Sequence, residues 1–183
     1  WRSRTLALAG NFNLTNVDEL FDILVDLGQH PKEKADTVTV LEKVGHFLDE
    51  EVEKAFRQFK NAGHENAEIS GLIADQLDVA NVLRRASINW DGGYVMGGII
   101  GSGDAFIARD PNGIRPCFWY EDEEVIVAAS ERPVIQTAFN CVTTDVKELQ
   151  PGEALIINRN GESQIAEVRE PGERTPCSFE RIY

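Results

Sequence analysis

Hydrophobic residues in the first half of the chain recur every three or four positions, which is typical of amphipathic helices. The first such stretch follows Asn16, an N-cap residue with Glu19 three positions later as in a capping box, and it ends at Gly28. Its hydrophobic positions are Val17, Leu20, Phe21, Leu24 and Leu27. The same spacing predicts three more helices, at about 38–48, 50–60 and 69–86.

The pattern changes at Asn89. Beyond it glycine, β-branched and aromatic residues dominate, which predicts strands. One short helix, 131–139 with Ser130 as its cap, interrupts them, and Asn160-Gly161 is a hairpin-turn sequence. The strands are expected at 6–9 (followed by a loop at 10–16), 93–100, 105–109, 117–120, 125–130, 154–158 and 163–168. Helices followed by strands predict an α+β fold.

A charged turn joins two of these strands, with the sequence Arg109-Asp110-Pro111-Asn112-Gly113-Ile114-Arg115-Pro116. Proline fixes its own φ, asparagine tolerates a left-handed backbone and glycine accepts positive φ, so Asp-Pro-Asn-Gly predicts a tight connection. One interpretation is a hairpin with charged flanks. The other is a turn locked by a bidentate pair between Asp110 and an arginine, Arg109 or Arg115.

This turn and four further motifs, in the same order along the chain, resemble the glutaminase domain of the amidophosphoribosyltransferase family. That domain is a class II glutamine amidotransferase. The further motifs are Asn11-Phe12-Asn13-Leu14-Thr15-Asn16, which is similar to Asn-Gly-Asn-Leu-Thr-Asn; Ala129-Ser130-Glu131; Asp145-Val146 with Leu149-Gln150-Pro151-Gly152-Glu153; and Cys177-Ser178-Phe179-Glu180-Arg181-Ile182-Tyr183. Five motifs that span most of the chain make the resemblance specific.

The resemblance implies a four-layer αββα sandwich, with two antiparallel sheets between helical layers. It implies that residues 1–170 are a partial glutaminase domain and that 171–183 are a linker toward a phosphoribosyltransferase domain outside this chain. In the family, a cysteine at the mature N-terminus attacks the amide of glutamine. The first hundred positions contain no cysteine. We therefore expect that sequence precedes Trp1 and that the 183 residues alone are inactive.

The resemblance also implies where glutamine binds. The oxyanion hole would consist of the Asn11 side chain and the backbone N–H of Phe12, where the family has glycine. Gly10 replaces the family's histidine. Asp36 would bind the α-ammonium group of glutamine, because a carboxylate forms charge-assisted hydrogen bonds with it. Two structural interpretations stay open: Asn11 as a turn residue, and Asp36, or its neighbour Thr37, as a helix N-cap.

Composition limits the classes of binding partner and the cellular location that we expect. The net charge of −13 argues against binding to nucleic acid or to anionic lipid, and no apolar run is long enough to span a membrane. No signal peptide is visible, and three widely spaced cysteines, Cys117, Cys141 and Cys177, fit a reducing cytoplasm. We expect no metal and no cofactor in this domain. The resemblance implies magnesium with phosphoribosyl pyrophosphate in the absent domain, and a homo-oligomeric full-length enzyme.

The preferred function is the glutaminase step of an enzyme that transfers the amide nitrogen of glutamine to phosphoribosyl pyrophosphate in purine synthesis. One alternative is another class II amidotransferase, of the type that makes glucosamine 6-phosphate. Ile114-Arg115-Pro116 and the motif at 177–183 favour the first. A second alternative is a non-catalytic module, which Gly10 and Phe12 keep open.

Overall fold

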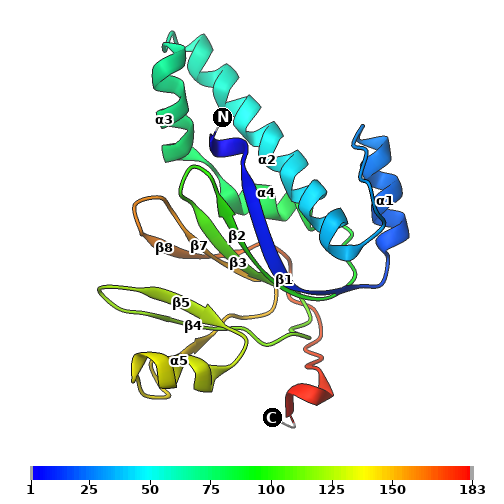
Figure 1. Cartoon of the computed structure of the whole chain (residues 1–183), viewed down its shortest axis with the longest axis vertical. Helices are drawn as coiled ribbons and strands as arrows, with labels where there is room; N and C mark the ends of the chain where they lie inside the picture. The colour runs from blue at the N-terminus through cyan, green and yellow to red at the C-terminus, as the bar shows by residue number, and fades with distance from the viewer. Residues whose placement is uncertain (1, 182–183) are drawn as a thin grey trace.

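Two antiparallel β-sheets lie at the centre of the computed structural model, which describes residues 2–181 (Figure 1). The larger sheet has the strand order β1-β2-β3-β7-β8, and the smaller sheet has the order β5-β4-β6. The larger sheet consists of β1 (Leu6–Leu14), β2 (Gly92–Ile100), β3 (Ala105–Arg109), β7 (Glu153–Ile157) and β8 (Ser163–Glu167). The smaller sheet consists of β4 (Phe118–Glu121), β5 (Ile126–Ala129) and β6 (Lys147–Glu148). The neighbouring strands of both sheets pair in the antiparallel sense, as predicted.

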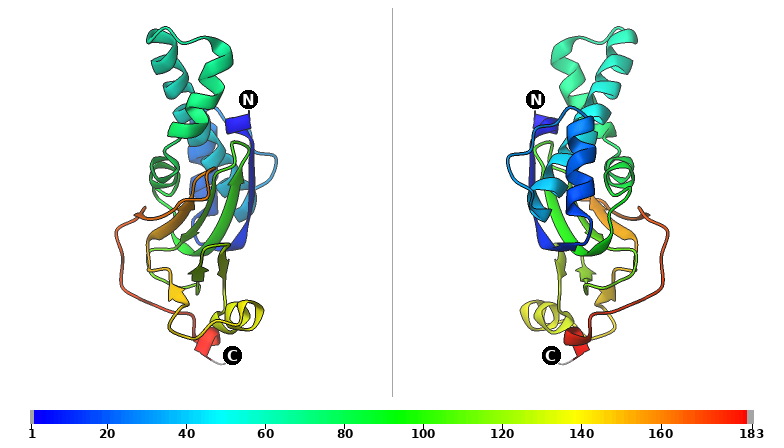
Figure 2. Two further views of the ribbon diagram at one scale, coloured as in Figure 1. Left: turned by 90° about the vertical axis from the view of Figure 1, so that its left-hand side faces the viewer. Right: turned by 90° about the vertical axis from the view of Figure 1, so that its right-hand side faces the viewer.

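Helices lie on the outer sides of both sheets (Figures 1 and 2). Four helices lie on one side of the larger sheet: α1 (Val17–Asp26), α2 (Asp36–Asn61), α3 (Asn66–Gln76) and α4 (Val79–Ala86). Helices α2 and α4 pack on its strands, and α1 and α3 pack on α2. The fifth, α5 (Arg132–Phe139), packs on β4 and β5. Short 3-10 turns, η1 (Arg2–Arg4) and η2 (Ser178–Arg181), lie near the two ends of the described chain.

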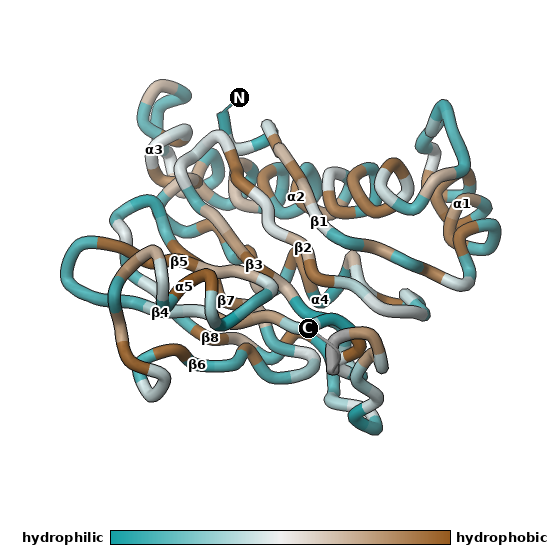
Figure 3. Tube along the Cα trace, turned by 60° about the horizontal axis from the view of Figure 1, so that its bottom comes forward, coloured by the Kyte–Doolittle hydropathy of each residue, from teal (hydrophilic) through white to brown (hydrophobic). Residues whose placement is uncertain are grey.

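The main core lies between α2 to α4 and the larger sheet. Helix α2 alternates between hydrophilic and hydrophobic residues along its length (Figure 3), as expected for a helix with one face on a sheet. The buried hydrophobic residues of that face are Val40, Val44, Leu48, Val52 and Phe59. They pack with Tyr94, Met96, Ile100, Phe106, Ala108, Ala154 and Ile156 of the sheet.

A second hydrophobic cluster joins the two sheets. Its buried members are Cys117, Trp119, Leu149 and Leu155. The partly buried residues around them come from both sheets: Val95, Ile107 and Ile157 from the larger, Ile126 and Ala128 from the smaller. The layers therefore follow the order helices, sheet, sheet, helix, which confirms the predicted αββα arrangement.

Strand β1 is longer than predicted. The sequence suggested a strand at 6–9 followed by a loop, but residues 10–14 continue the strand because each pairs with a residue of β2, from Gly10 opposite Met96 to Leu14 opposite Gly92. Asparagine and glycine have low strand propensity, yet cross-strand pairing over nine residues overrides it. The candidate residues Asn11 and Phe12 thus lie in a strand and not in a loop.

Two helix boundaries also differ from the sequence predictions. The segments 38–48 and 50–60 form one continuous helix, α2, because neither glycine nor proline breaks the chain between them. The segment predicted as one helix at 69–86 is divided into α3 and α4. Asp78 causes the break: its carboxylate accepts a hydrogen bond from Asn81 N–H at 2.9 Å and caps a new helix.

Predicted helix caps were correct in position only for α1. Asn16 is the N-cap of α1, but its side chain makes no capping hydrogen bond and binds Asn89 O instead. Ala35 occupies the N-cap of α2, and Asp36, predicted as a possible cap, lies in the first turn. Helix α5 begins after Glu131, so Ser130 is not its cap. The short strand β6 was not predicted, since only two residues of the chain take part in it.

Candidate functional site

Asn11 projects from the face of the larger sheet that is opposite the helices. In strand β1 the residues alternate between faces, and Asn11 is exposed on the face of Ala7 and Ala9. Phe12 is partly buried and packs against the main core on the helix side. Its ring therefore does not occupy the space around the Asn11 side chain.

Asp36 meets the end of the same strand. Its Oδ2 accepts a hydrogen bond from Leu14 N–H at 2.9 Å, and Leu14 is three residues beyond Asn11. The carboxylate lies in the first turn of α2, where the helix dipole favours negative charge. Asp36 is thus bonded to the C-terminal end of the strand that carries Asn11, although the two residues are 25 positions apart in the sequence.

Hydrogen bonds fix the corner that follows β1. Thr15 N–H donates to Asp91 O at 2.8 Å, and Asn16 Nδ2 donates to Asn89 O at 2.7 Å. Asp91 N–H in turn donates to Asn16 Oδ1 at 3.3 Å. These contacts tie the corner to the segment before β2 and hold the end of the strand that carries Asn11, and the hydrogen bond from Leu14 to Asp36 links that end to α2.

The charged turn at 109–115 is built around a buried carboxylate. Asp110 is fully buried and accepts hydrogen bonds from the backbone N–H groups of Asn112, Ile114 and Arg115 at 3.0–3.1 Å, and from Tyr94 N–H at 3.4 Å. A carboxylate satisfied by several N–H groups holds a turn without any arginine. Asp110 therefore holds the turn, as the second interpretation proposed, but through backbone N–H groups instead of an arginine; the hairpin interpretation is wrong, because β3 and β4 lie in different sheets.

Arg109 binds other partners than Asp110. Its guanidinium donates to three carbonyl oxygens, those of Arg115, Gly113 and Leu149, and forms an ion pair with Glu148 at 2.8 Å. The arginine side chain is only 2% exposed. The predicted Asp110–Arg109 pair is thus wrong. Sequence reasoning missed Glu148, although it lies beside the recognised segment 149–153, because an acidic residue next to a turn is usually solvated.

Gly113 is required for this arrangement. Its φ of +60° lies in the left-handed region, and a Cβ there would stand 2.9 Å from Pro151 Cγ and 3.3 Å from Arg109 Nη2. The carbonyl of Asp110 also accepts hydrogen bonds from Gly113 N–H at 3.2 Å and from Gly152 N–H at 3.1 Å. The turn and the Pro-Gly-Glu segment, two of the recognised motifs, therefore form one unit.

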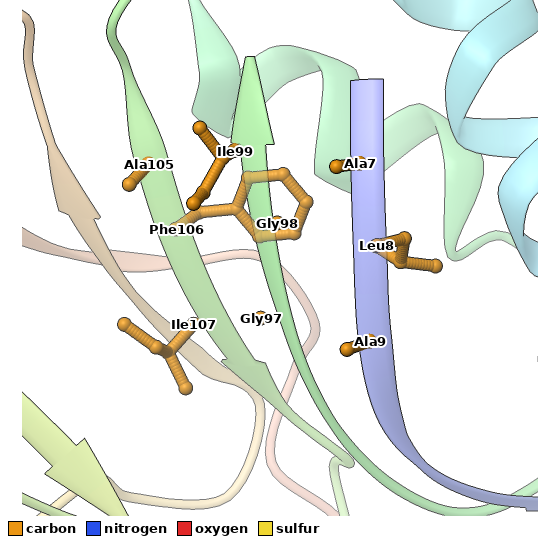
Figure 4. Close-up of a pocket in the computed structure, with 9 residues that line it drawn as sticks. All are labelled: Ala7, Leu8, Ala9, Gly97, Gly98, Ile99, Ala105, Phe106 and Ile107. Carbon is orange, nitrogen blue, oxygen red and sulfur yellow. The ribbon is translucent and has the colours of Figure 1, made fainter.

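The turn lies in one row with Asn11. The register of the larger sheet pairs Asn11 with Val95 and Val95 with Arg109. An apolar trough of about 390 Å³ lies on the same sheet face (Figure 4), and its lining residue Ala9 is two positions before Asn11 in β1. It is lined by Ala7, Leu8, Ala9, Gly97, Gly98, Ile99, Ala105, Phe106 and Ile107. Because alanine and glycine supply much of this lining, few large side chains rise from the sheet beside the candidate site.

Cys117 is unsuited to act as a nucleophile. It is buried in the cluster between the sheets, and burial, the largest cause, raises the pKa of its thiol to about 11. The thiol is therefore protonated near neutral pH, whereas the nucleophile must be a thiolate. Cys141 and Cys177 are partly buried free thiols. Within residues 2–181, no group of three or more acidic, histidine or cysteine side chains is placed to bind a metal ion.

None of the helices in the described part of the chain combines the length and hydrophobicity of a membrane span.

The chain is similar in sequence to known enzymes over almost its whole length. The sequence is similar to amidophosphoribosyltransferases of Pasteurella multocida, with 29% identity over 185 residues, and of Bacillus subtilis, with 30% identity over 184 residues. These matches cover 97% and 98% of this chain but 32% and 31% of the two relatives. The chain thus spans about one third of the length of these relatives.

Solved structures show the same relationship. Glutamine phosphoribosylpyrophosphate amidotransferase from Bacillus subtilis, in complex with ADP and GMP, superposes with a TM-score of 0.65 and 26% identity over 97% of this chain. A structure described as the allosteric regulatory enzyme of purine biosynthesis gives a TM-score of 0.65 and 25% identity. The family profile of the class II glutamine amidotransferases matches residues 73–171, more than half of the chain. The chain therefore belongs to the class II glutamine amidotransferases.

Proposed function

We propose that this chain is the glutaminase part of an amidophosphoribosyltransferase, and that Asn11 and Asp36 bind its substrate glutamine. The observation that carries this proposal is the position of the two side chains at one end of β1, where Asp36 binds Leu14 N–H and Asn11 lies exposed on the open sheet face. The similarity to amidophosphoribosyltransferases over 97% of the chain supports the choice of enzyme.

Each residue has a distinct task. A thiolate from polypeptide outside these 183 residues attacks the side-chain carbonyl of glutamine and forms a tetrahedral oxyanion. The Asn11 amide and the Phe12 N–H stabilise that charge. Asp36 binds the α-ammonium group and orients the substrate. Transfer to the departing nitrogen of the proton that the thiol lost on ionisation allows the C–N bond to break, which releases ammonia and leaves a thioester. Water then hydrolyses the thioester to glutamate and restores the thiol.

The acceptor reaction takes place beyond the chain. The ammonia lone pair forms a bond to C1 of phosphoribosyl pyrophosphate, the bond from C1 to the pyrophosphate oxygen breaks, and a proton leaves the new amine. The products are phosphoribosylamine and pyrophosphate. A phosphoribosyltransferase domain of the same polypeptide would bind this substrate with magnesium, since this chain covers only about a third of its relatives.

The experiment uses the full-length protein and two acceptors. Glutamine-dependent release of pyrophosphate from phosphoribosyl pyrophosphate, accompanied by one glutamate per turnover, is the expected result. Glutamine-dependent amination of fructose 6-phosphate instead would show an enzyme of the glucosamine 6-phosphate type. Binding of glutamine without glutamate formation would indicate a non-catalytic module. In a parallel assay the 183-residue chain should release no ammonia, because Cys117 is buried and protonated.

A further inference from the structure

The segment that leaves the domain is attached to the charged turn. We call residues 171–177 the exit segment; in Figure 2 it runs from the end of β8 along the outside of the molecule toward the C-terminus. Three of its backbone N–H groups donate to carbonyl oxygens of the turn: Gly172 to Pro111 at 2.8 Å, Thr175 to Asn112 at 2.8 Å and Cys177 to Ile114 at 3.1 Å. Hydrogen bonds spaced from Gly172 to Cys177 therefore hold almost the whole exit segment against the turn.

Two side chains reinforce this attachment. Asn112 Nδ2 donates to Glu173 O at 3.0 Å, from the tip of the turn to the middle of the exit segment. Arg174 Nη2 donates to Glu148 Oε1 at 2.5 Å. The same Glu148 oxygen accepts from the buried Arg109 at 2.8 Å, so a single carboxylate connects the interior of the domain with the exit segment.

The turn is a fixed point in the fold. The buried Asp110 carboxylate accepts hydrogen bonds from the backbone N–H groups of the turn. Arg109, at the start of the turn, is aligned with Val95 and Asn11 across the larger sheet. Composition alone suggests a free linker for Pro-Gly-Glu-Arg-Thr-Pro. The observed bonds hold the exit segment at a defined position relative to the sheet that carries Asn11.

We propose that Asn112 and Arg174 are positioning residues, which fix the direction in which the chain leaves the glutaminase domain and thereby place the acceptor domain so that it receives the released ammonia. This inference rests on the proposed function. Ammonia that escapes into water is diluted and protonated, and an ammonium ion has no lone pair for attack on C1. A loosely attached acceptor domain would thus lose ammonia without slowing either half-reaction.

The test measures three quantities in the full-length protein: glutamate formation, synthesis from added ammonia, and product formed per glutamate. In Asn112→Ala, Arg174→Gln and the double variant, the first two should stay within about twofold of the parent. Each single variant removes one contact and the double variant removes two, so product per glutamate should fall by up to about fivefold in the single variants and by up to about 25-fold in the double variant. Arg159→Gln is the matched control, because Arg159 pairs with Asp75 and follows the end of β7 that is remote from the turn.

Hydrogen exchange of residues 171–177 in the same protein tests the attachment directly. Asn112→Ala should accelerate exchange of these amides by about fivefold, and Arg159→Gln should leave it unchanged. Unaltered exchange in Asn112→Ala and Arg174→Gln would overturn the attachment. Faster exchange with unchanged product per glutamate would overturn the positioning role. A parent protein that forms no product from glutamine would contradict the proposed function, and the exchange experiment would still decide the attachment.

Discussion

The ring of Phe12 lies where a side chain of Gly10 would stand. A Cβ built on Gly10 would be 2.7 Å from Phe12 Cζ, because both residues face the helix side of β1. In the family motif that the sequence resembles, histidine and glycine take these two positions. The two departures therefore compensate each other: a side chain is lost at one position and gained at the other. Asn11 points to the opposite face, so the exchange leaves its surroundings open.

Replacing Gly10 with alanine should destabilise the protein by about 1–3 kcal/mol, the usual cost of overpacking. The new methyl group would also approach Val95 O at 2.6 Å and Met96 Cα at 2.9 Å. Urea unfolding measures the effect. As a control, Gly71→Ala in α3 should stabilise the protein by about 0.5–1 kcal/mol, because alanine favours a helix over glycine and the new methyl group would meet no atom within 4 Å.

The compensation itself can be tested by a double variant. Phe12→Ala removes the ring, so the cost of Gly10→Ala should be smaller in the Phe12→Ala background than in the parent. Some cost should persist, since the Val95 carbonyl belongs to the backbone and cannot move away freely. Strictly additive effects would show that the ring and the glycine are unrelated.

Lys43 is a buried lysine of α2 whose ammonium group donates to Ile88 O. Burial, the largest cause, and the nearby Arg169 lower its pKa from 10.5 to about 8, while Glu19 acts in the opposite direction. Between these two pH values the unfolded chain retains a proton that the folded protein has lost. The free energy of unfolding should therefore rise as the pH increases from about 8 to 10.5.

Comparison with Lys43→Met isolates this contribution. The parent should gain about 1–3 kcal/mol relative to the variant over that pH range. Lys54→Met, which removes an exposed lysine of the same helix, should follow the parent. Parallel pH profiles of the parent and Lys43→Met would mean that Lys43 has an ordinary pKa in the folded protein.

The sequence predicted local structure well where local patterns decide it. Strand β3 and helix α1 follow directly from residue spacing, and the turn at 109–115 from its Asp-Pro-Asn-Gly sequence. Residues 10–14 of β1 could not be predicted, because their strand conformation depends on pairing with β2, about eighty residues later. Glu148, which its local sequence suggests is solvated, also depends on distant residues, because its partners are Arg109 and Arg174. The resemblance indicated Asn11 and Asp36, while only the structure shows that Asp36 is bonded to the strand that carries Asn11.

Asp36→Asn in the full-length protein should raise KM for glutamine by about 10- to 100-fold, with a smaller change in kcat. The lost charge weakens a bond to the α-ammonium group, which does not react. Asparagine retains an acceptor for Leu14 N–H, so the fold should be preserved. Asp18→Asn, at an exposed carboxylate of α1, is the control and should leave KM unchanged. A lower kcat at unchanged KM would count against the assignment.

Asn11→Ala tests the oxyanion site most directly. Asn11 is exposed on a strand that is paired along its length, so the substitution removes a polar side chain without creating a cavity. A neutral donor stabilises a charge that appears only in the transition state, and its loss should lower kcat for glutamine hydrolysis by about 100- to 1000-fold. Synthesis from added ammonia bypasses the glutamine site and should stay nearly unchanged. Asn13→Ala, two residues further on the same face, is the matched control. If both activities of Asn11→Ala fell together, Asn11 would be a structural residue and the oxyanion donor would lie elsewhere.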